Sequence, residues 1–288
     1  MNQPEQRRPL ALVTGSSRGL GAAVAERLAN DGFDLVITYR KQADLAESVA
    51  ERCRQNGAEA TCIEMDLELE ASITAGMAAI QASAGRLDVL VANAAATSFR
   101  PLLDASRAHL ERTFAISVFG FHQLVQASVP LMQANGGGRI IAVSGADTRT
   151  WIPGHGLLAA AKASMESMVE YFGCELASQN ITTIGIAPGF IDGDSIKAML
   201  GPFYDMAMDA ERETHPMRMA VSPELGAETI SLLCRPEARF LNGSTVAADG
   251  AGVFAFCGRY STMGAKAILA EGAVAADASA PAVPLHPS

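Results

Sequence analysis

Hydrophobic positions along the chain follow two alternating patterns. Short, nearly continuous apolar runs suit strands covered on both faces, and the segments between them carry an apolar residue every third or fourth position, as amphipathic helices do. The apolar runs predict strands at 10–14, 33–39, 60–67, 87–95, 139–145, 182–189 and 244–250. The amphipathic segments predict helices that begin near residue 20 and span about 42–56, 70–84, 106–134, 156–179 and 223–233.

The first strand breaks into a glycine-rich turn, TGSSRGLG at 14–21. Glycine at positions 15, 19 and 21 lets the chain turn sharply, brings backbone N–H groups close to a pyrophosphate and lets the next helix pack on the sheet. The same glycines could merely link a strand to a helix. The strand at 33–39 favours a cofactor-binding turn, because it completes a β-α-β unit of about the usual 30 residues.

These elements predict one α/β domain over residues 1–258, built on a Rossmann-type doubly wound parallel sheet of about seven strands. Its ligand crevice is expected at the carboxyl ends of the strands. The methionine-rich segment at about 192–222 has a mixed pattern and is expected to form a lid. Residues 259–288 are expected to be a largely disordered extension, because most of that segment is rich in alanine and proline.

Composition narrows the range of partners. The chain has 288 residues, of which 49% are apolar, so it can bury a large core. Its formal net charge of −9 argues against nucleic acid or an anionic membrane surface as the main partner. The first residues are too polar for a secretion signal, and we therefore expect a cytoplasmic protein. The five cysteines lack metal-ligand spacing, so no metal site is expected.

Several motifs together resemble the short-chain dehydrogenase/reductase family from about residue 10 to residue 256. They are TGSSRGLG at 14–21, Asp66-Leu67, ANAA at 92–95, Lys162 and Pro188-Gly189. The resemblance implies a nicotinamide cofactor, with its ring near Pro188, Gly189 and Ile191 and its adenine near Asp66. It also implies a homo-oligomer, a dimer or tetramer, paired through the two long helices. The cofactor-binding residues that follow are Gly15, Ser17, Arg18, Gly19, Leu20, Gly21, Arg40, Asp66, Leu67, Asn93, Ala94, Lys162, Pro188, Gly189 and Ile191.

The charge beside the second strand indicates which nicotinamide cofactor binds. An acidic residue at that place would accept the ribose hydroxyls of NAD and repel a 2′-phosphate. Here the strand ends in Tyr39-Arg40-Lys41, and Arg18 lies within the glycine turn. Arg18 and Arg40 could hold a 2′-phosphate by charge-assisted hydrogen bonds, which favours NADPH. The alternative is that both arginines are solvated surface charges.

The residues for proton transfer depart from the family pattern. Members of the family carry Tyr-x-x-x-Lys, a serine thirteen residues before the tyrosine and an asparagine on the preceding long helix. Lys162 matches the lysine, but the tyrosine position holds Leu158, the serine position Gly145 and the asparagine position Ser117. A leucine cannot donate a proton, so another source is required.

His155 is the sharpest alternative for the missing acid. Enoyl reductases of this family place six residues between tyrosine and lysine, and that spacing reaches His155. Imidazole side chains often act as general acids. The surrounding PGHG is also typical of an ordinary loop. Ser144, beside Gly145, could contact a substrate oxygen, although a hydroxyl at a strand end more often caps the backbone. The candidate catalytic residues are Lys162, Ser144, His155 and Ser117.

Two functional hypotheses remain open. The first is an NADPH-dependent reductase that acts on a ketone whose own neighbouring hydroxyl supplies the proton, as in a polycyclic aromatic polyketide of antibiotic biosynthesis; an enoyl reductase is its variant. The second is an NADPH-binding regulator that kept the fold and lost the chemistry. Lys162 argues for the enzyme, since an abandoned site gives little reason to keep it. The apolar residues of the lid and Trp151 could contact a flat ligand.

Overall fold

The computed structural model describes residues 7–253, and within them the chain forms one parallel sheet with helices on both faces. The sheet has seven strands in the order β3-β2-β1-β4-β5-β6-β7. Its strands are β1 (Leu10–Val13), β2 (Asp34–Tyr39), β3 (Ala60–Glu64), β4 (Val89–Ala92), β5 (Gly138–Val143), β6 (Ile181–Ala187) and β7 (Thr245–Ala247). This is the Rossmann-type architecture that the alternating pattern predicts, with the strand order reversing between β1 and β4.

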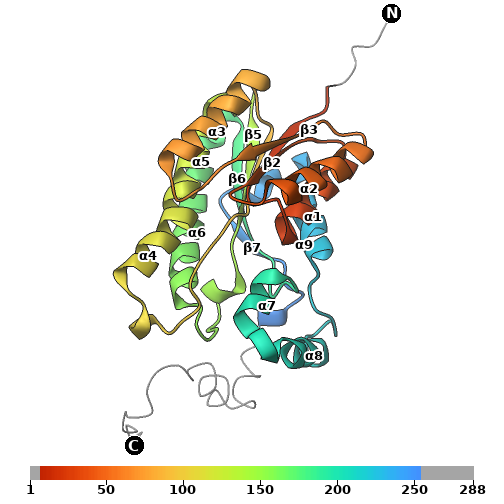
Figure 1. Cartoon of the computed structure of the whole chain (residues 1–288). Coiled ribbons are helices and arrows are strands. Elements are labelled where there is room, and N and C mark those ends of the chain that lie inside the picture. Colours follow the sequence, from red (N-terminus) through yellow and green to blue (C-terminus); the bar gives the residue numbers. More distant parts are fainter. Residues whose placement is uncertain (1–6, 254–288) are drawn as a thin grey trace, which may run out of the picture.

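The helices form two layers around the sheet (Figure 1). One layer contains α1 (Gly19–Asn30), α2 (Ala43–Gln55) and α9 (Pro223–Leu233). The other contains α3 (Glu70–Ser83), α5 (Gly120–Gln133) and α6 (Gly156–Leu176), and α4 (Arg107–Phe114) runs into α5. At the carboxyl ends of the strands lie α7 (Asp194–Leu200) and α8 (Tyr204–Thr214). Short 3-10 turns cover Leu102–Asp104, Ala146–Thr148, Ala177–Gln179, Gly201–Phe203 and Pro236–Leu241.

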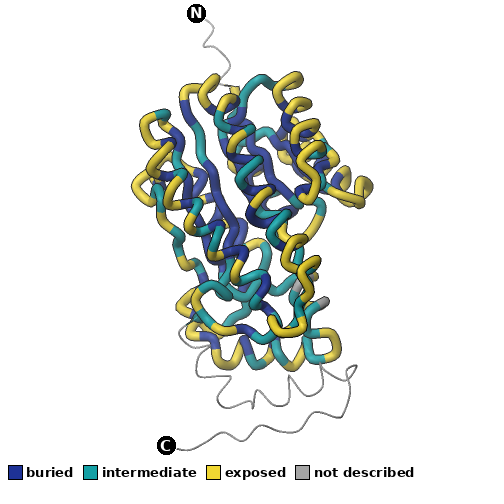
Figure 2. The backbone as a smooth tube through the Cα atoms, turned by 90° about the vertical axis from the view of Figure 1, so that its left-hand side faces the viewer, coloured by how far each residue is buried: buried dark blue, intermediate teal, exposed yellow. Residues whose placement is uncertain are grey.

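Each strand contributes to two separate cores because successive side chains point to opposite faces. In β4, Val89 and Val91 pack with the α1, α2 and α9 layer, whereas Leu90 packs with α3, α5 and α6. Figure 2 shows the strands as buried ribbons between helices whose outer turns are exposed. Near-continuous apolar strands are therefore required, as the sequence pattern indicated.

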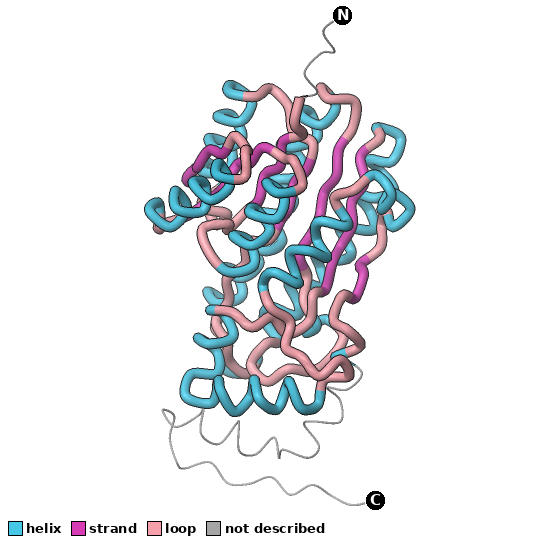
Figure 3. The backbone as a smooth tube through the Cα atoms, turned by 90° about the vertical axis from the view of Figure 1, so that its right-hand side faces the viewer, coloured by secondary structure: helices cyan, strands magenta, loops and turns pink. Residues whose placement is uncertain are grey.

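The predicted elements are confirmed, with shorter strands and one interruption. The helix expected at 106–134 consists of α4 and α5 joined by a π-helical turn at Ala115–Phe119. The segment at about 192–222 contains α7, a 3-10 turn and α8; whether it acts as a lid stays a prediction. Figure 3 shows that loops and these helices cover the carboxyl ends of the strands. The predicted extension at 259–288 lies outside the described residues.

One helical span in the described chain, Arg107–Gln133, passes a length and composition test for a membrane-crossing helix. Half of its most apolar window is buried inside the protein. Several apolar residues of this span, including Phe121, Leu124 and Val125, pack in the core, whereas Leu110 and Phe119 are exposed. Core packing therefore accounts for much of its composition.

Candidate active site

The glycine turn after β1 lies at the switch point of the sheet, where a ligand can approach its backbone. Gly15 and Gly19 have φ values of 63° and 56°, a region that glycine enters at little cost. A Cβ on Gly21 would collide with the Gly15 carbonyl oxygen, and one on Gly15 would lie 2.9 Å from the Ala94 Cβ. These positions therefore require glycine for conformation, for close packing or for both.

Two neighbouring strands hold this turn in place. The side-chain amide of Asn93, after β4, donates to the Thr14 carbonyl at 3.0 Å. The Thr14 hydroxyl accepts from the backbone N–H groups of Asn93 and Ala94, at 3.0 and 3.1 Å. From β2, the Thr38 hydroxyl accepts from the Gly15 N–H at 3.1 Å. Asn93 and Ala94 thus act from the next strand across the sheet, which fixes the turn before any ligand arrives.

The amino end of α1 fits a phosphate. Arg18 is its N-cap residue and forms no side-chain cap hydrogen bond, and the first turn has no acidic residue. By contrast, α4 and α9 are capped by the hydroxyls of Ser106 and Ser222. The first N–H groups of α1 and the positive end of its dipole are therefore directed toward the space beside the turn.

The arginines expected to read the 2′-phosphate lie on the surface near this turn. Arg18 and Arg40 are exposed, and Arg40 forms an ion pair with Glu68 at 3.8 Å. Glu68 also contacts the Nε of Arg112 on α4, at 3.4 Å. Arg40 and Arg112 thus share one carboxylate, that of Glu68. Sequence reasoning missed Glu68 and Arg112 because α4 reaches this point only in the folded chain.

The loop after β6 forms the other wall of the crevice. Pro188 is buried, and Gly189 has a φ of 76°. A Cβ on Gly189 would lie 2.8 Å from the Asp249 Cβ, so a side chain is excluded there. Ile191 pairs with Val221 in an isolated parallel bridge. These residues lie where the resemblance places the nicotinamide, at the carboxyl end of β6.

Lys162 is fully enclosed in the core of the site. It lies on α6, is 4% exposed, and donates from Nζ to the Val143 carbonyl at the end of β5, at 2.5 Å. Burial lowers the pKa of Lys162 to about 8, and the charges of Asp147 and Glu166 oppose this shift. The ammonium therefore changes charge close to neutrality, as a group handling a proton or a ribose hydroxyl can do.

Ser144 is directed to α6 and not toward the crevice loop. Its hydroxyl donates to Glu166 Oε1 at 2.5 Å, and the Thr148 hydroxyl donates to the same oxygen at 2.9 Å. Glu166 lies one helical turn after Lys162, so the two charged side chains share one face of α6. In this arrangement the Ser144 proton is already engaged.

His155 forms a pair that the sequence did not reveal. Its Nδ1 lies 3.2 Å from Asp147 Oδ2, and the Asp147 side chain is only 4% exposed. Its Nε2 lies 2.8 Å from the Met199 sulfur of α7, and its ring packs against Phe99 at 4.9 Å. Asp147 and His155 lie on the loop between β5 and α6, and no spacing rule identifies such a contact in advance.

The remaining candidate, Ser117, lies in the π-helical turn between α4 and α5. It is 3% exposed, and its hydroxyl has no hydrogen-bond partner among residues 7–253. π-Helical turns are rare and frequent at functional sites. Leu158 lies one turn before Lys162 on α6, and a Cβ on Gly145 would collide with Asp147 Oδ1. Leu158 and Gly145 thus stand at the positions where the resemblance implies a tyrosine and a serine.

Comparison with known proteins shows which family the chain is similar to. A family model described as Enoyl-(Acyl carrier protein) reductase matches residues 15–252. The chain is 32% identical over 255 residues to 1-cyclohexenylcarbonyl-CoA reductase of Streptomyces collinus, covering 87% of this chain and 90% of that protein. The solved structure of the angucycline C-6 ketoreductase LanV with bound NADP aligns with a TM-score of 0.78 at 26% identity, over 85% of this chain and 96% of that one.

A second ketoreductase structure aligns equally broadly. It is that of LugOII, which catalyses keto-reduction at C1 during lugdunomycin biosynthesis, with a TM-score of 0.76 and 26% identity over 84% of this chain and 96% of that one. The chain belongs to the short-chain dehydrogenase/reductase family. It is an NAD(P)H-dependent oxidoreductase of the kind that acts on carbonyl or alcohol groups.

Proposed function

We propose that the protein is an NADPH-dependent ketoreductase that reduces a carbonyl of a polycyclic aromatic, angucyclinone-like polyketide, with a proton supplied by the substrate itself. One observation carries this proposal. The cofactor turn and Lys162 are in place, whereas Leu158 and Gly145 occupy the positions from which the family's tyrosine and serine act. In lacking this tyrosine and serine, the chain is an atypical member of the family.

The chain's own residues bind and orient the cofactor. The turn at Gly15 and the amino end of α1 hold the pyrophosphate, Arg18 and Arg40 hold the 2′-phosphate, and Lys162 holds the nicotinamide ribose. When bound, NADPH supplies a hydride to the carbonyl carbon. The oxygen that becomes negative then takes a proton from a phenol on the same substrate, and water restores that phenol. Correct positioning provides much of the rate, so no protein acid is required.

The proposed substrate class has two supports. LanV acts on angucyclines and LugOII on an intermediate of lugdunomycin biosynthesis, as their descriptions state. In addition, Trp151 is 59% exposed at the loop after β5, and Met199 reaches His155 from α7. Flat aromatic rings bind well to such surfaces. On this basis we further propose that the chain is similar to the angucyclinone ketoreductase of simocyclinone biosynthesis.

The experiment compares two ketones that differ in whether a phenolic proton is available beside the carbonyl. One is a tetralone whose carbonyl is hydrogen-bonded to a neighbouring phenol, and the other is its methyl ether. With saturating NADPH, we expect the phenol to be reduced at least about 100-fold faster, which is the usual contribution of a positioned acid. Equal rates would contradict substrate assistance. NADPH binding without turnover of either ketone would contradict the proposed substrate class.

The Asp147–His155 pair supports a second mechanism. A carboxylate 3.2 Å from Nδ1 can stabilise an imidazolium, so His155 is a possible general acid. Under substrate assistance, His155→Ala keeps the rate with the phenolic tetralone within about tenfold of wild type. Loss of all activity with unchanged NADPH affinity would show that His155, and not the substrate, supplies the proton.

The enoyl reductase variant rests on the description of the matching family model. In that reaction the hydride adds to a carbon–carbon double bond conjugated to a carbonyl. An enone of the same ring skeleton distinguishes the two reactions. Product analysis by mass spectrometry and NMR shows whether the ketone or the alkene is reduced, and we expect the ketone.

A further inference from the structure

A cavity of about 450 Å³ opens at the amino ends of the strands, at the opposite edge of the sheet from the cofactor turn. Its lining comes from the starts of β4, β5 and β6, the loop before β5, and the segment after α9. A volume of this size is typical of sites for small molecules. None of the residues assigned to cofactor or catalysis lines it.

The floor of the cavity is one row of the sheet. Val89, Arg139 and Thr182 are direct neighbours across β4, β5 and β6, so their side chains point to the same face. All three line the cavity. Arg139 Nε and Thr182 Oγ1 are shielded from solvent, and neither has a hydrogen-bond partner within residues 7–253. The floor thus holds more polar groups than the protein satisfies.

Arg139 is a half-buried cation without a carboxylate partner in the described part of the chain. Burial lowers its pKa, which reflects the cost of removing the guanidinium from water. Its Nη1 donates to the Cys234 carbonyl at the end of α9, at 3.3 Å, which uses one of five donors. Arg239, at the exposed rim, adds a second positive charge and stacks on Phe240 at 5.5 Å.

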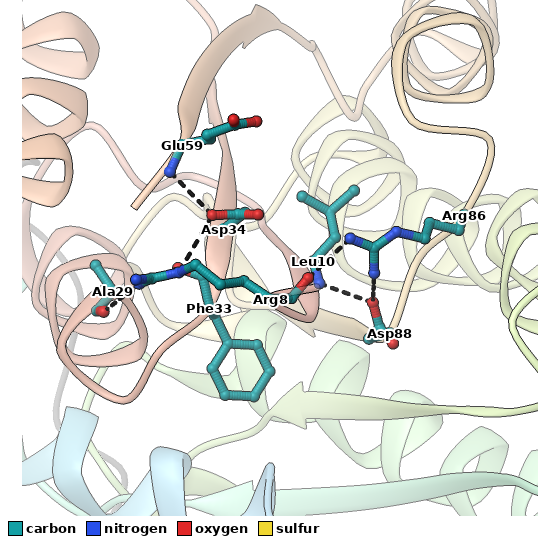
Figure 4. A network of polar contacts seen from close by, with 8 residues as sticks. All are labelled: Arg8, Leu10, Ala29, Phe33, Asp34, Glu59, Arg86 and Asp88. Carbon is teal, nitrogen blue, oxygen red and sulfur yellow. Dashed lines mark hydrogen bonds and ion pairs between the residues drawn. The ribbon is translucent and has the colours of Figure 1, made fainter. Parts of the chain in front are cut away.

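The acidic group in the cavity lining is already hydrogen-bonded to other residues. Asp88, the carboxylate in the lining, accepts from Arg86 at 2.6 Å, from the Leu10 N–H at 2.7 Å and from Asn135. Figure 4 shows Arg86 and Asp88 turned toward each other beside Leu10, with Arg8 paired to Asp34 in the same network. Glu237 acts on Arg139 only through its longer-range charge.

We propose that this cavity binds a small oxyanion with a compact apolar body. The carboxylate or phosphate group lies between Arg139 and Arg239. Phe33, Val89 and Pro236 provide apolar walls for the body. An unpaired, partly desolvated guanidinium gains most from such a partner, since pairing offsets the desolvation that burial has already imposed.

The site is tested with benzoate and inorganic phosphate as probes on the full-length chain. Benzoate titrated to about 10 mM should raise the melting temperature, and calorimetry should give one site per chain. Arg139→Gln should weaken benzoate binding about tenfold or more, the usual effect of removing a charge-assisted contact. Thr182→Val, which keeps the side-chain shape and removes a hydroxyl that is shielded from solvent, should leave the affinity unchanged. Preference for benzoate over phosphate indicates a carboxylate with an apolar body, and the reverse preference indicates a phosphate ester.

Two controls separate this site from surface charge and from the cofactor crevice. Arg235→Gln changes an exposed arginine of the same segment that does not line the cavity, and it should leave the affinity unchanged. Saturating NADPH should also leave it unchanged, because the cofactor turn lies at the other edge of the sheet. Absence of binding of either probe, or equal affinity in wild type and Arg139→Gln, overturns the proposal. Should Arg139→Gln fail to fold, Arg239→Gln replaces it.

Discussion

Lys162 combines two properties that conflict energetically. A fully buried ammonium is costly, and the nearby carboxylates of Asp147 and Glu166 reduce this cost only in part, because the pKa still falls to about 8. The residue is therefore retained at the expense of stability. This is the pattern of a functional group and not of a core residue.

The first prediction follows from this lowered pKa. Since Lys162 loses its proton near pH 8 in the folded state and near 10.5 when unfolded, the unfolded chain binds more protons between these values. The free energy of unfolding of wild type, relative to Lys162→Met, should rise by about 2 kcal/mol from about pH 7.5 to about pH 10. Urea unfolding of both proteins at the two pH values measures it. A difference independent of pH contradicts the shift.

Arg40 provides a prediction about cofactor choice. Arg40→Ala should raise the KM for NADPH about tenfold and leave the KM for NADH within about twofold, because only NADPH carries the 2′-phosphate. Arg107→Ala is the matched control: Arg107 is an exposed arginine on α4 that pairs with Glu111 at 2.6 Å. Equal changes for both cofactors in Arg40→Ala would show that Arg40 is a solvated surface charge.

Helix α9 has a side-chain cap at its amino end. The Ser222 hydroxyl accepts from the Leu225 N–H at 3.2 Å, and Pro223 occupies the first helical position. Through Ala227 and Ile230 the helix closes the core on the α1 side of the sheet. Helix α1 has no side-chain cap at its amino end, which lies beside the glycine turn.

Removing this cap should weaken the whole fold modestly. Ser222→Ala is expected to lower the free energy of unfolding by about 1 kcal/mol, whereas Ser222→Asp, which can also cap, should stay within about 0.5 kcal/mol of wild type. Denaturant titration measures both variants. If the alanine and aspartate variants are equally destabilised, the cap does not set the stability of α9.

For the molecule as a whole, the homo-oligomer remains a prediction. Leu110 on α4, Phe119 in the π-helical turn and Tyr171 on α6 are 40%, 58% and 67% exposed. Apolar side chains exposed on neighbouring helices are typical of an interface between copies. We propose that these helices pair two chains about a twofold axis.

Introducing a positive charge into this apolar surface tests the assembly. Tyr171→Arg and Phe119→Arg should each convert the assembly to a smaller species, because an isologous interface carries the change twice. Sedimentation velocity measures the mass. Leu45→Arg, at an exposed leucine on α2 in the opposite layer, should leave it unchanged. A wild-type monomer, or variants of unchanged mass, contradicts the pairing.

The sheet and the cofactor turn could be predicted from local patterns. Apolar runs of strand length and glycines at 15, 19 and 21 are properties of neighbouring residues, so periodicity and spacing identify them. The separation of Leu158 from Lys162 is equally local, because a helix places them one turn apart. The interruption of α4–α5 at Ala115–Phe119 was not foreseen, since a π-helical turn leaves no periodic signal.

Local patterns of this kind do not predict contacts between distant segments. Asp147 meets His155, Glu68 links Arg40 to Arg112, and these contacts depend on how loops and helices pack. Arg139 and Thr182 become neighbours only through the register of β5 and β6. The sequence thus predicts the strand, glycine turn and helix proposed to bind the cofactor, and it has Leu158 and Gly145 where the resemblance implies a tyrosine and a serine. Folding alone determines which charges are paired and which remain without a partner, because burial and distance belong to the packed chain.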